Sequence, residues 1–261
     1  MITTFILLLI GLALFWLVNQ NYNNDWIKPN ASFSAHWRQL LQQNVSYYKD
    51  LSPKEKALFE YKVQEFLLNV KIVGIQTTIN DLDRLLVASS AVIPIFAFPE
   101  WTYKNLDEVL IYSNTFNLDF ETSGEERQIL GMVGNGFMER KMILSKKALR
   151  LGFKNETDKK NTAIHEFVHL IDKADGKVDG IPAVLLEKQY VIPWVDMIEQ
   201  KIEEILERES DINPYGGTSR IEFFAVISEY FFERPALLKR KHPKLYEILS
   251  EIFDQDLGVK K

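Results

Sequence analysis

The residues of this sequence with the clearest capacity for chemistry are two histidines four positions apart, His165 and His169, with Glu166 directly after the first. Side chains four positions apart lie on the same face of a helix, so both imidazoles can bind one divalent ion. Glu166 then lies on the adjoining side of the helix, where a carboxylate can accept a proton from a metal-activated water. This spacing predicts a metal-dependent hydrolytic site, and a helix with two structural histidines is the alternative.

The sequence around this motif favours a helix and indicates the metal. Asn161 or Thr162 can cap the helix, apolar residues follow at helical spacing, and Gly176 is well placed to end it. The chain contains no cysteine, which excludes thiolate ligands, thiol nucleophiles and disulfide scaffolds. Imidazole and carboxylate ligands without thiolate are typical of catalytic zinc, so we expect one zinc ion per chain.

A catalytic zinc ion needs a third protein ligand and an open fourth position, and spacing alone leaves the third ligand open. The remaining histidines, His36 and His242, belong to no motif, so a carboxylate is favoured. Asp172 shares a helix face with His169, where it is better placed to accept the free N–H of a ligand histidine. The candidate carboxylates are Asp172, Asp175, Asp179, Glu187, Glu222 and Glu229.

Two of these carboxylates, Glu222 and Glu229, lie seven positions apart in the apolar segment 220–230. Seven positions are two helical turns, so both side chains share one face. Burying a carboxylate is costly unless it meets a cation or hydrogen-bond donors, and a metal ion is one way to meet this need. The alternative is a helix with ordinary solvent-facing glutamates.

The elements that must position these residues are predicted to be mostly helical. Ser52, Pro53 and Glu55 form a capping-box start for a helix that extends to about residue 69. A second helix is expected over residues 81–91, with leucines on one face. Short strands early and helices late predict an α+β fold that is predominantly helical with a small sheet. The strands are expected at residues 72–79, 109–112 and 142–144.

The composition is that of a globular protein. The 261 residues are 46% hydrophobic and carry a formal net charge of −5. Disordered and fibrous classes are therefore excluded, and the length suffices for a large core without disulfides. Nothing in this balance provides the basic surface that nucleic-acid binding needs, so we expect no nucleic-acid partner.

The amino terminus is interpreted as an uncleaved membrane anchor. Residues 2–18 contain no charge, and at about 1.5 Å per residue they would span roughly 25 Å as a helix. A signal peptide would have a basic residue before this run and a small-residue cleavage site after it, and the sequence has neither. The alternative is a buried core helix. Basic residues follow the run, which places the soluble part in the cytoplasm. The expected organisation is a transmembrane helix at 1–18, a linker at 19–39, a domain at 40–255 and a tail at 256–261.

Three segments in order resemble the Mlc titration factor A family of zinc metallopeptidases: HEFVHLIDKADG, DGIP and INPYGGTSRIEFFAVISEYFFERP. The upstream segments LSPKEK, LDRLLVASSA, VLIYSNTF and MILS also resemble that family, so the similarity covers roughly residues 40–255. The catalytic domain of this family is similar to that of lethal-factor-type zinc proteases. The resemblance therefore implies a zincin-like fold.

The resemblance also implies a role for each site residue. It makes Glu166 the catalytic base and Tyr215, seven positions before Glu222, a hydroxyl group that assists the transition state. Glu229 then supports a ligand instead of binding the metal. The chain departs from the family at Gly216-Gly217, where two alanines are usual, and this would loosen the turn that carries Tyr215. The implied metal ligands are His165, His169 and Glu222.

Two functions from different classes follow. The first is a membrane-tethered zinc peptidase that hydrolyses peptide bonds of a peptide or protein substrate with a metal-activated water. The second, which the family name implies, is a zincin-fold binding module that sequesters a transcriptional repressor with little or no hydrolysis. The complete His-Glu-His set favours the enzyme, because sequestration alone does not require Glu166.

Overall fold

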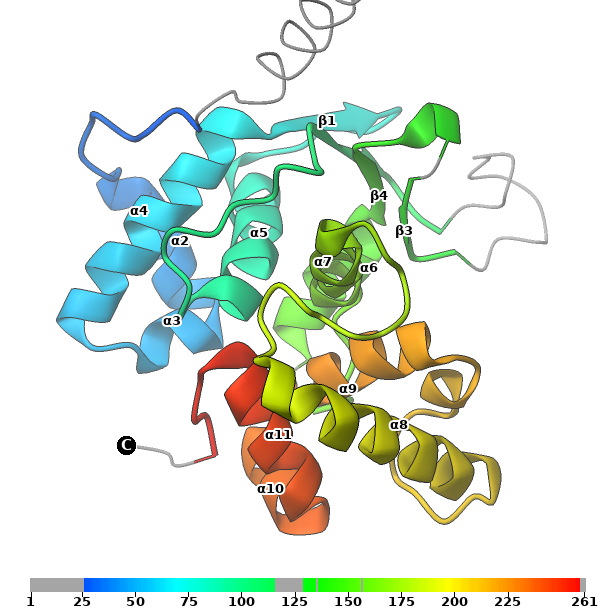
Figure 1. Cartoon of the computed structure of the whole chain (residues 1–261). Coiled ribbons are helices and arrows are strands. Elements are labelled where there is room, and N and C mark those ends of the chain that lie inside the picture. The colour runs from blue at the N-terminus through cyan, green and yellow to red at the C-terminus, as the bar shows by residue number, and fades with distance from the viewer. Residues whose placement is uncertain (1–25, 116–128, 135, 156, 259–261) are drawn as a thin grey trace, which may run out of the picture.

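The computed structural model describes residues 26–115, 129–134, 136–155 and 157–258 of the chain. In these segments helices pack around a small sheet of short strands, which confirms the predicted, mostly helical α+β class (Figure 1). The strands are β1 (Lys71–Ile75), β2 (Glu108–Tyr112), β3 (Gly131–Val133) and β4 (Lys141–Ser145). The α-helices are α2 (Ala35–Asn44), α3 (Ser46–Asp50), α4 (Pro53–Asn69), α5 (Asp81–Val92), α6 (Lys146–Lys154), α7 (Thr162–Asp172), α8 (Val191–Leu206), α9 (Arg220–Glu233), α10 (Pro235–Lys241) and α11 (Pro243–Phe253).

The sheet is mixed, with strand order β1-β2-β4-β3. The first two pairs are parallel, and β3 pairs antiparallel with β4 at the edge of the sheet. The strands predicted around 109–112 and 142–144 are confirmed. The predicted strand from residue 72 ends at Ile75, because Gln76 adopts a left-handed φ of 52° that interrupts the extended backbone. The sequence did not predict β3.

Two helices begin at the capping boxes that their sequences allow. At the start of α4, the Ser52 hydroxyl accepts a hydrogen bond from the Glu55 amide at 3.4 Å, and the Glu55 carboxylate accepts one from the Ser52 amide at 2.7 Å. Asn80 and Asp83 form the same reciprocal pair at the start of α5. The predicted starts of both helices are therefore confirmed, since side chains satisfy amides that have no partner within the helix.

The core holds α7 in the middle of the molecule, in contact with β3, β4, α5 and α9 (Figure 1). Its fully buried Phe167 lies edge-on to two other aromatic rings, with centroids 5.7 Å from Phe66 and 5.1 Å from Tyr103. On the other side, α9 is buried over most of its length and packs against α7. Side chains at the interface of these two helices are therefore held by a close-packed frame.

The predicted membrane localisation, with the remainder in the cytoplasm, is corrected here. A membrane-spanning helix needs about 20 predominantly apolar residues. The longest helix that the structure describes is α4, with 17 residues, several of them charged. Within the described segments no helix is long and apolar enough to cross a membrane. The predicted anchor, residues 2–18, lies outside the described residues.

The segment that precedes residue 40 packs onto α4. The Trp26 ring lies 6.2 Å from the Phe66 ring, and the Asn69 side chain exchanges two hydrogen bonds with the backbone of Ile27. Helix α2 already begins at Ala35, before the boundary expected at residue 40. The expected domain boundaries stay a prediction.

Candidate metal centre

Helix α7 presents His165 and His169 on one face, as their spacing predicts. Its N-cap is Asn161, whose side-chain oxygen accepts a hydrogen bond from the amide of Ile164 at 3.2 Å. After α7 the chain makes one 3₁₀ turn and reaches Gly176, whose φ of 89° is left-handed and ends the helical path. The two imidazole rings lie 4.7 Å apart between centroids, and their Nε2 atoms are 3.1 Å apart.

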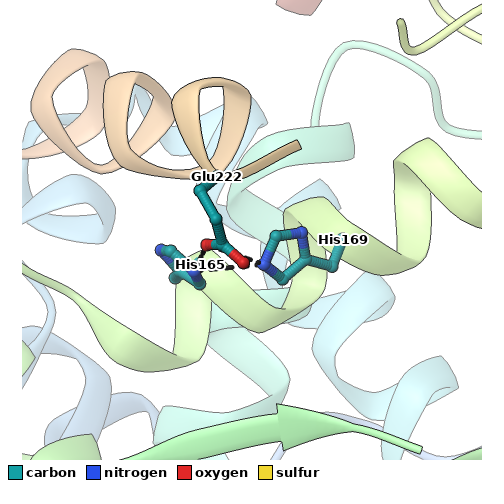
Figure 2. Close-up of side chains that lie close together, drawn as sticks. All are labelled: His165, His169 and Glu222. Atoms are coloured by element: carbon teal, nitrogen blue, oxygen red, sulfur yellow. Dashed lines mark hydrogen bonds and ion pairs between the residues drawn. The ribbon is translucent and has the colours of Figure 1, made fainter. Parts of the chain in front are cut away.

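Helix α9 supplies a carboxylate to the same point. The hydroxyl of Ser219 caps this helix by accepting a hydrogen bond from the amide of Glu222 at 3.1 Å, which fixes Glu222 in the first turn. Its Oε2 lies 3.0 Å from Nε2 of His165 and 3.5 Å from Nε2 of His169. Figure 2 shows the Glu222 side chain extending from α9 to both imidazoles of α7.

These three side chains form a candidate metal centre. One ligand atom from each lies within 4.8 Å of the other two. Among the residues that the structure describes, no other set of three His, Asp or Glu side chains converges this closely. The other two histidines lie beside aspartates elsewhere, His36 at 4.0 Å from Asp81 and His242 at 2.8 Å from Asp211. The five other candidate carboxylates lie outside the converging set: Asp172, Asp175, Asp179, Glu187 and Glu229.

The carboxylate that contacts His165 through Nδ1 is Glu229, as the resemblance implied, and not Asp172, as the shared helix face suggested. Glu229 accepts a hydrogen bond from Nδ1 of His165 at 2.8 Å and another from the backbone amide of Asn161 at 2.5 Å. With its Nδ1 proton donated to Glu229, the neutral form of His165 would present the lone pair of Nε2 to a metal ion. A carboxylate on an apolar helix was the feature of the sequence that indicated a buried partner for Glu229. Nothing in the sequence indicated its second contact, with the amide of Asn161.

Asp172 instead holds a loop. Its Oδ2 accepts a hydrogen bond from the amide of Gly180 at 3.1 Å, while its Oδ1 has no hydrogen-bond partner among the described residues. Burial raises the pKa of this carboxyl to about 6, and the nearby Asp179 adds to the effect. Gly180 in turn lies against the start of α9, where a Cβ atom would come within 2.5 Å of the Arg220 carbonyl oxygen. Asp172 therefore helps to set how the loop meets α9.

The charges at the centre favour a cation. Burial lowers the pKa of His165, but its hydrogen bonds with Glu222 and Glu229 outweigh burial and raise that pKa to about 10. Burial raises the pKa of Glu222, but its hydrogen bonds with both histidines outweigh burial and hold that pKa well below its usual range. In the metal-free protein a proton on His165 supplies the positive charge that the two carboxylates require.

Glu166 and Tyr215 both lie close to the centre. Glu166 is only 6% exposed; burial raises the pKa of its carboxyl, and the two ligand histidines partly offset this effect. Tyr215 belongs to the 3₁₀ turn η5 (Pro214–Gly217), and its ring lies 6.1 Å from the His165 ring at an angle of 30°. Its side chain is half exposed, and partial burial together with the charge of Glu222 raises the pKa of its hydroxyl. The structure thus places both predicted residues at the centre.

Comparison with known proteins gives consistent results. The chain is 28% identical over 229 residues to an uncharacterized protein of Synechocystis sp., with 84% of this chain and 83% of the relative covered. It is 23% identical over 255 residues to Mlc titration factor A of Pectobacterium atrosepticum, which covers 92% of each chain. It is 28% identical over 249 residues to Mlc titration factor A of Salmonella arizonae, which covers 88% of this chain and 96% of the relative.

The chain also matches the sequence pattern of a protein family over most of its length. Residues 19–254 match the glucose-regulated metallo-peptidase M90 family. This match includes both metal-facing helices, the sheet and the turn η5. Together with the relatives, it confirms the resemblance that the sequence motifs indicated. This chain belongs to the glucose-regulated metallo-peptidase M90 family.

Proposed function

We propose that this protein is a zinc-dependent peptidase of zincin-like fold that hydrolyses peptide bonds. The observation that carries the proposal is the convergence of His165, His169 and Glu222 within 4.8 Å of one another, next to the buried carboxylate of Glu166. Membership of a metallo-peptidase family supports the same reaction class. Two imidazoles and one carboxylate, with no thiolate, are the donors that a catalytic zinc ion uses.

The distances between the donor atoms also fit zinc. Ligand atoms at about 2.0–2.1 Å from a tetrahedral ion lie about 3.3 Å from one another. The three donor pairs of this centre are separated by 3.0, 3.1 and 3.5 Å. When bound there, zinc would lower the pKa of a water molecule and polarise the carbonyl group of the substrate.

The residues of the chain then have distinct roles. Glu166 accepts a proton from the attacking water and passes it to the leaving amine, and burial makes its carboxylate a stronger base because it raises the pKa. Glu229 holds His165 in the tautomer that a metal ligand requires. Tyr215 donates its hydroxyl proton in a hydrogen bond to the developing oxyanion, an interaction stronger in the transition state than in the ground state.

The test uses the full chain, loaded with zinc and incubated with a mixed peptide library that is read by mass spectrometry. Glu166→Gln should abolish hydrolysis and still bind one zinc ion, because the substitution removes the base but no ligand. Glu247→Gln, on the exposed side of α11, is the matched control and should retain wild-type activity. Full peptidase activity in Glu166→Gln would contradict the mechanism.

Tyr215→Phe separates the second proposed role from the first. It should lower kcat about 10- to 100-fold with zinc still bound, because one donor to the oxyanion is lost. An unchanged kcat would limit Tyr215 to packing against His165.

A second candidate function is supported by the names of the relatives. Several of them are called Mlc titration factor A, a name that describes binding of the regulator Mlc by those proteins. By this reading the chain sequesters a transcriptional repressor and hydrolyses peptides weakly or not at all. Calorimetric titration with purified Mlc distinguishes peptide hydrolysis from sequestration. Sequestration would be favoured if wild type and Glu166→Gln bind Mlc equally tightly and the wild type hydrolyses no peptide of the library.

A further inference from the structure

The edge strand β3 lies directly against the proposed base. A Cβ atom built on Gly131 would lie 2.8 Å from Cγ and Oε1 of Glu166 and 2.8 Å from Cγ2 of Thr162. Non-bonded carbon atoms are normally about 3.5–4.0 Å apart, so no side chain fits at this position unless Glu166 or Thr162 moves. The backbone of β3 therefore forms one wall of the space that holds the Glu166 side chain.

The glycine at this position is explained by close approach and not by backbone conformation. Gly131 is not among the residues with positive φ, which include Gly136, Gly176 and Gly180. It pairs in regular antiparallel register with Leu144 of β4. A residue with a side chain would adopt the same φ and ψ without strain, so what excludes it is the contact with α7.

Packing matters more than usual for Glu166. Within the described part of the chain its carboxylate accepts no hydrogen bond, whereas Glu222 and Glu229 are both fixed by hydrogen bonds. The direction of the Glu166 side chain is then set by the walls around it, and Gly131 is the wall on the side of the sheet.

We propose that Gly131 is a positioning residue for Glu166: by lacking a side chain, it lets β3 pack against α7 with the Glu166 carboxylate directed at the metal centre. The role of this carboxylate as a base rests on the proposed peptidase function. The contact itself does not.

The first test is kinetic and uses the zinc-loaded full chain. Gly131→Ala should lower kcat at least tenfold, because a displacement of about 1 Å in a reacting group can cost about 100-fold. KM should stay within about twofold and the zinc content at one ion per chain, since no ligand is touched. Adding Thr162→Ser to Gly131→Ala removes the colliding methyl group of Thr162 and should restore part of kcat. Thr162→Ser alone is the control and should retain wild-type activity.

The second test requires no activity and no metal. In a double-mutant cycle on the midpoint of thermal unfolding, Gly131→Ala should lower the midpoint in the wild-type background. It should lower the midpoint less when combined with Glu166→Ala, because two of the three colliding atoms, Cγ and Oε1 of Glu166, are then gone. If Gly131→Ala alone fails to fold and the double variant folds, the proposal is supported. If the effect of Gly131→Ala is the same in both backgrounds, the proposal is overturned.

The third test reports on the centre when cobalt replaces zinc. The visible spectrum of the cobalt-loaded Gly131→Ala variant should shift toward that of Glu166→Ala, because the first variant displaces the carboxylate from the ion and the second removes it. A wild-type protein that hydrolyses nothing would refute the peptidase function, while the spectra and the unfolding cycle would still decide the role of Gly131. A Gly131→Ala variant with the wild-type cobalt spectrum and the wild-type kcat would overturn the positioning role.

Discussion

Asp172 offers the sharpest test of the electrostatics around α7. Its side chain is 1% exposed, one of its oxygens has no partner among the described residues, and burial raises its pKa from 3.8 to about 6. A carboxyl group whose pKa is higher in the folded state than in the unfolded state stabilises the folded state at low pH. This stability is lost as the pH rises from the pKa of the unfolded state through the pKa of the folded state. The ionised carboxylate of Asp172 therefore destabilises the protein at neutral pH.

The magnitude follows from the two pKa values. They differ by about 2 pH units, and each unit corresponds to about 1.4 kcal/mol, so the free energy of unfolding should fall by about 3 kcal/mol through Asp172. Most of this change should occur between about pH 4 and pH 7, the window that the two pKa values define. Asp172→Asn keeps an oxygen for the amide of Gly180 and has no charge to bury, so it should lack this part of the pH dependence.

The assay is urea unfolding of the metal-free protein at a series of pH values in this window. The informative quantity is the change in the free energy of unfolding across the window, compared between wild type and Asp172→Asn, because a constant effect of the substitution then cancels. Asp83→Asn is the matched control. Asp83 is also buried, but its ion pairs with Arg150 and Lys146 outweigh burial and lower its pKa below the ordinary 3.8. Its titration therefore lies below this window, and Asp83→Asn should keep the wild-type change in the free energy of unfolding between about pH 4 and pH 7. Identical pH profiles for wild type and Asp172→Asn would refute the reasoning.

Three further predictions concern zinc binding and helix stability. Glu229→Gln leaves one acceptor oxygen for two N–H donors, the Asn161 amide and Nδ1 of His165. Zinc affinity measured by chelator competition should therefore fall about 10- to 100-fold. An unchanged affinity would show that Glu229 does not support His165. The apparent zinc affinity should rise by up to about tenfold per pH unit between pH 6.5 and about 10, because His165 must lose a proton before it binds zinc. Calorimetry in buffers of different ionisation enthalpy should count about one released proton. No proton release would contradict the raised pKa of His165. Ser52→Ala removes the capping-box acceptor of α4 and should destabilise the protein by about 1 kcal/mol in urea unfolding, and no loss would mean that Glu55 alone fixes this start.

The sequence predicted most fully what local chemistry determines. The spacing of His165 and His169 is enough to place both imidazoles on one helix face, and the capping residues around Ser52 are enough to start α4. Each of these patterns depends on residues within a few positions of one another. The strand β3 escaped prediction because it has three residues and begins with glycine, a residue that is depleted in strands.

The contacts between α7 and α9 were harder to predict, because they depend on tertiary packing. Spacing left six carboxylates as candidates for the third ligand, and only the family resemblance singled out Glu222. A helix-face argument assigned Asp172 to support a histidine, but its carboxylate accepts from the backbone of Gly180 while Glu229 reaches across from α9. Helical periodicity tells which residues share a face, but it does not tell which other element that face will meet.

The double contact of Glu229 has a consequence for how the centre comes apart. One carboxylate from α9 holds both the imidazole of His165 and the amide of Asn161, the N-cap of α7, and the same helix carries Glu222. A fluctuation that lifts α9 therefore removes the Glu222 carboxylate, the acceptor of the His165 Nδ1 proton and the tether of the helix start in one event. Release of an ion bound at this centre and amide hydrogen exchange at the start of α7 should then share one opening rate, because one motion breaks both sets of contacts.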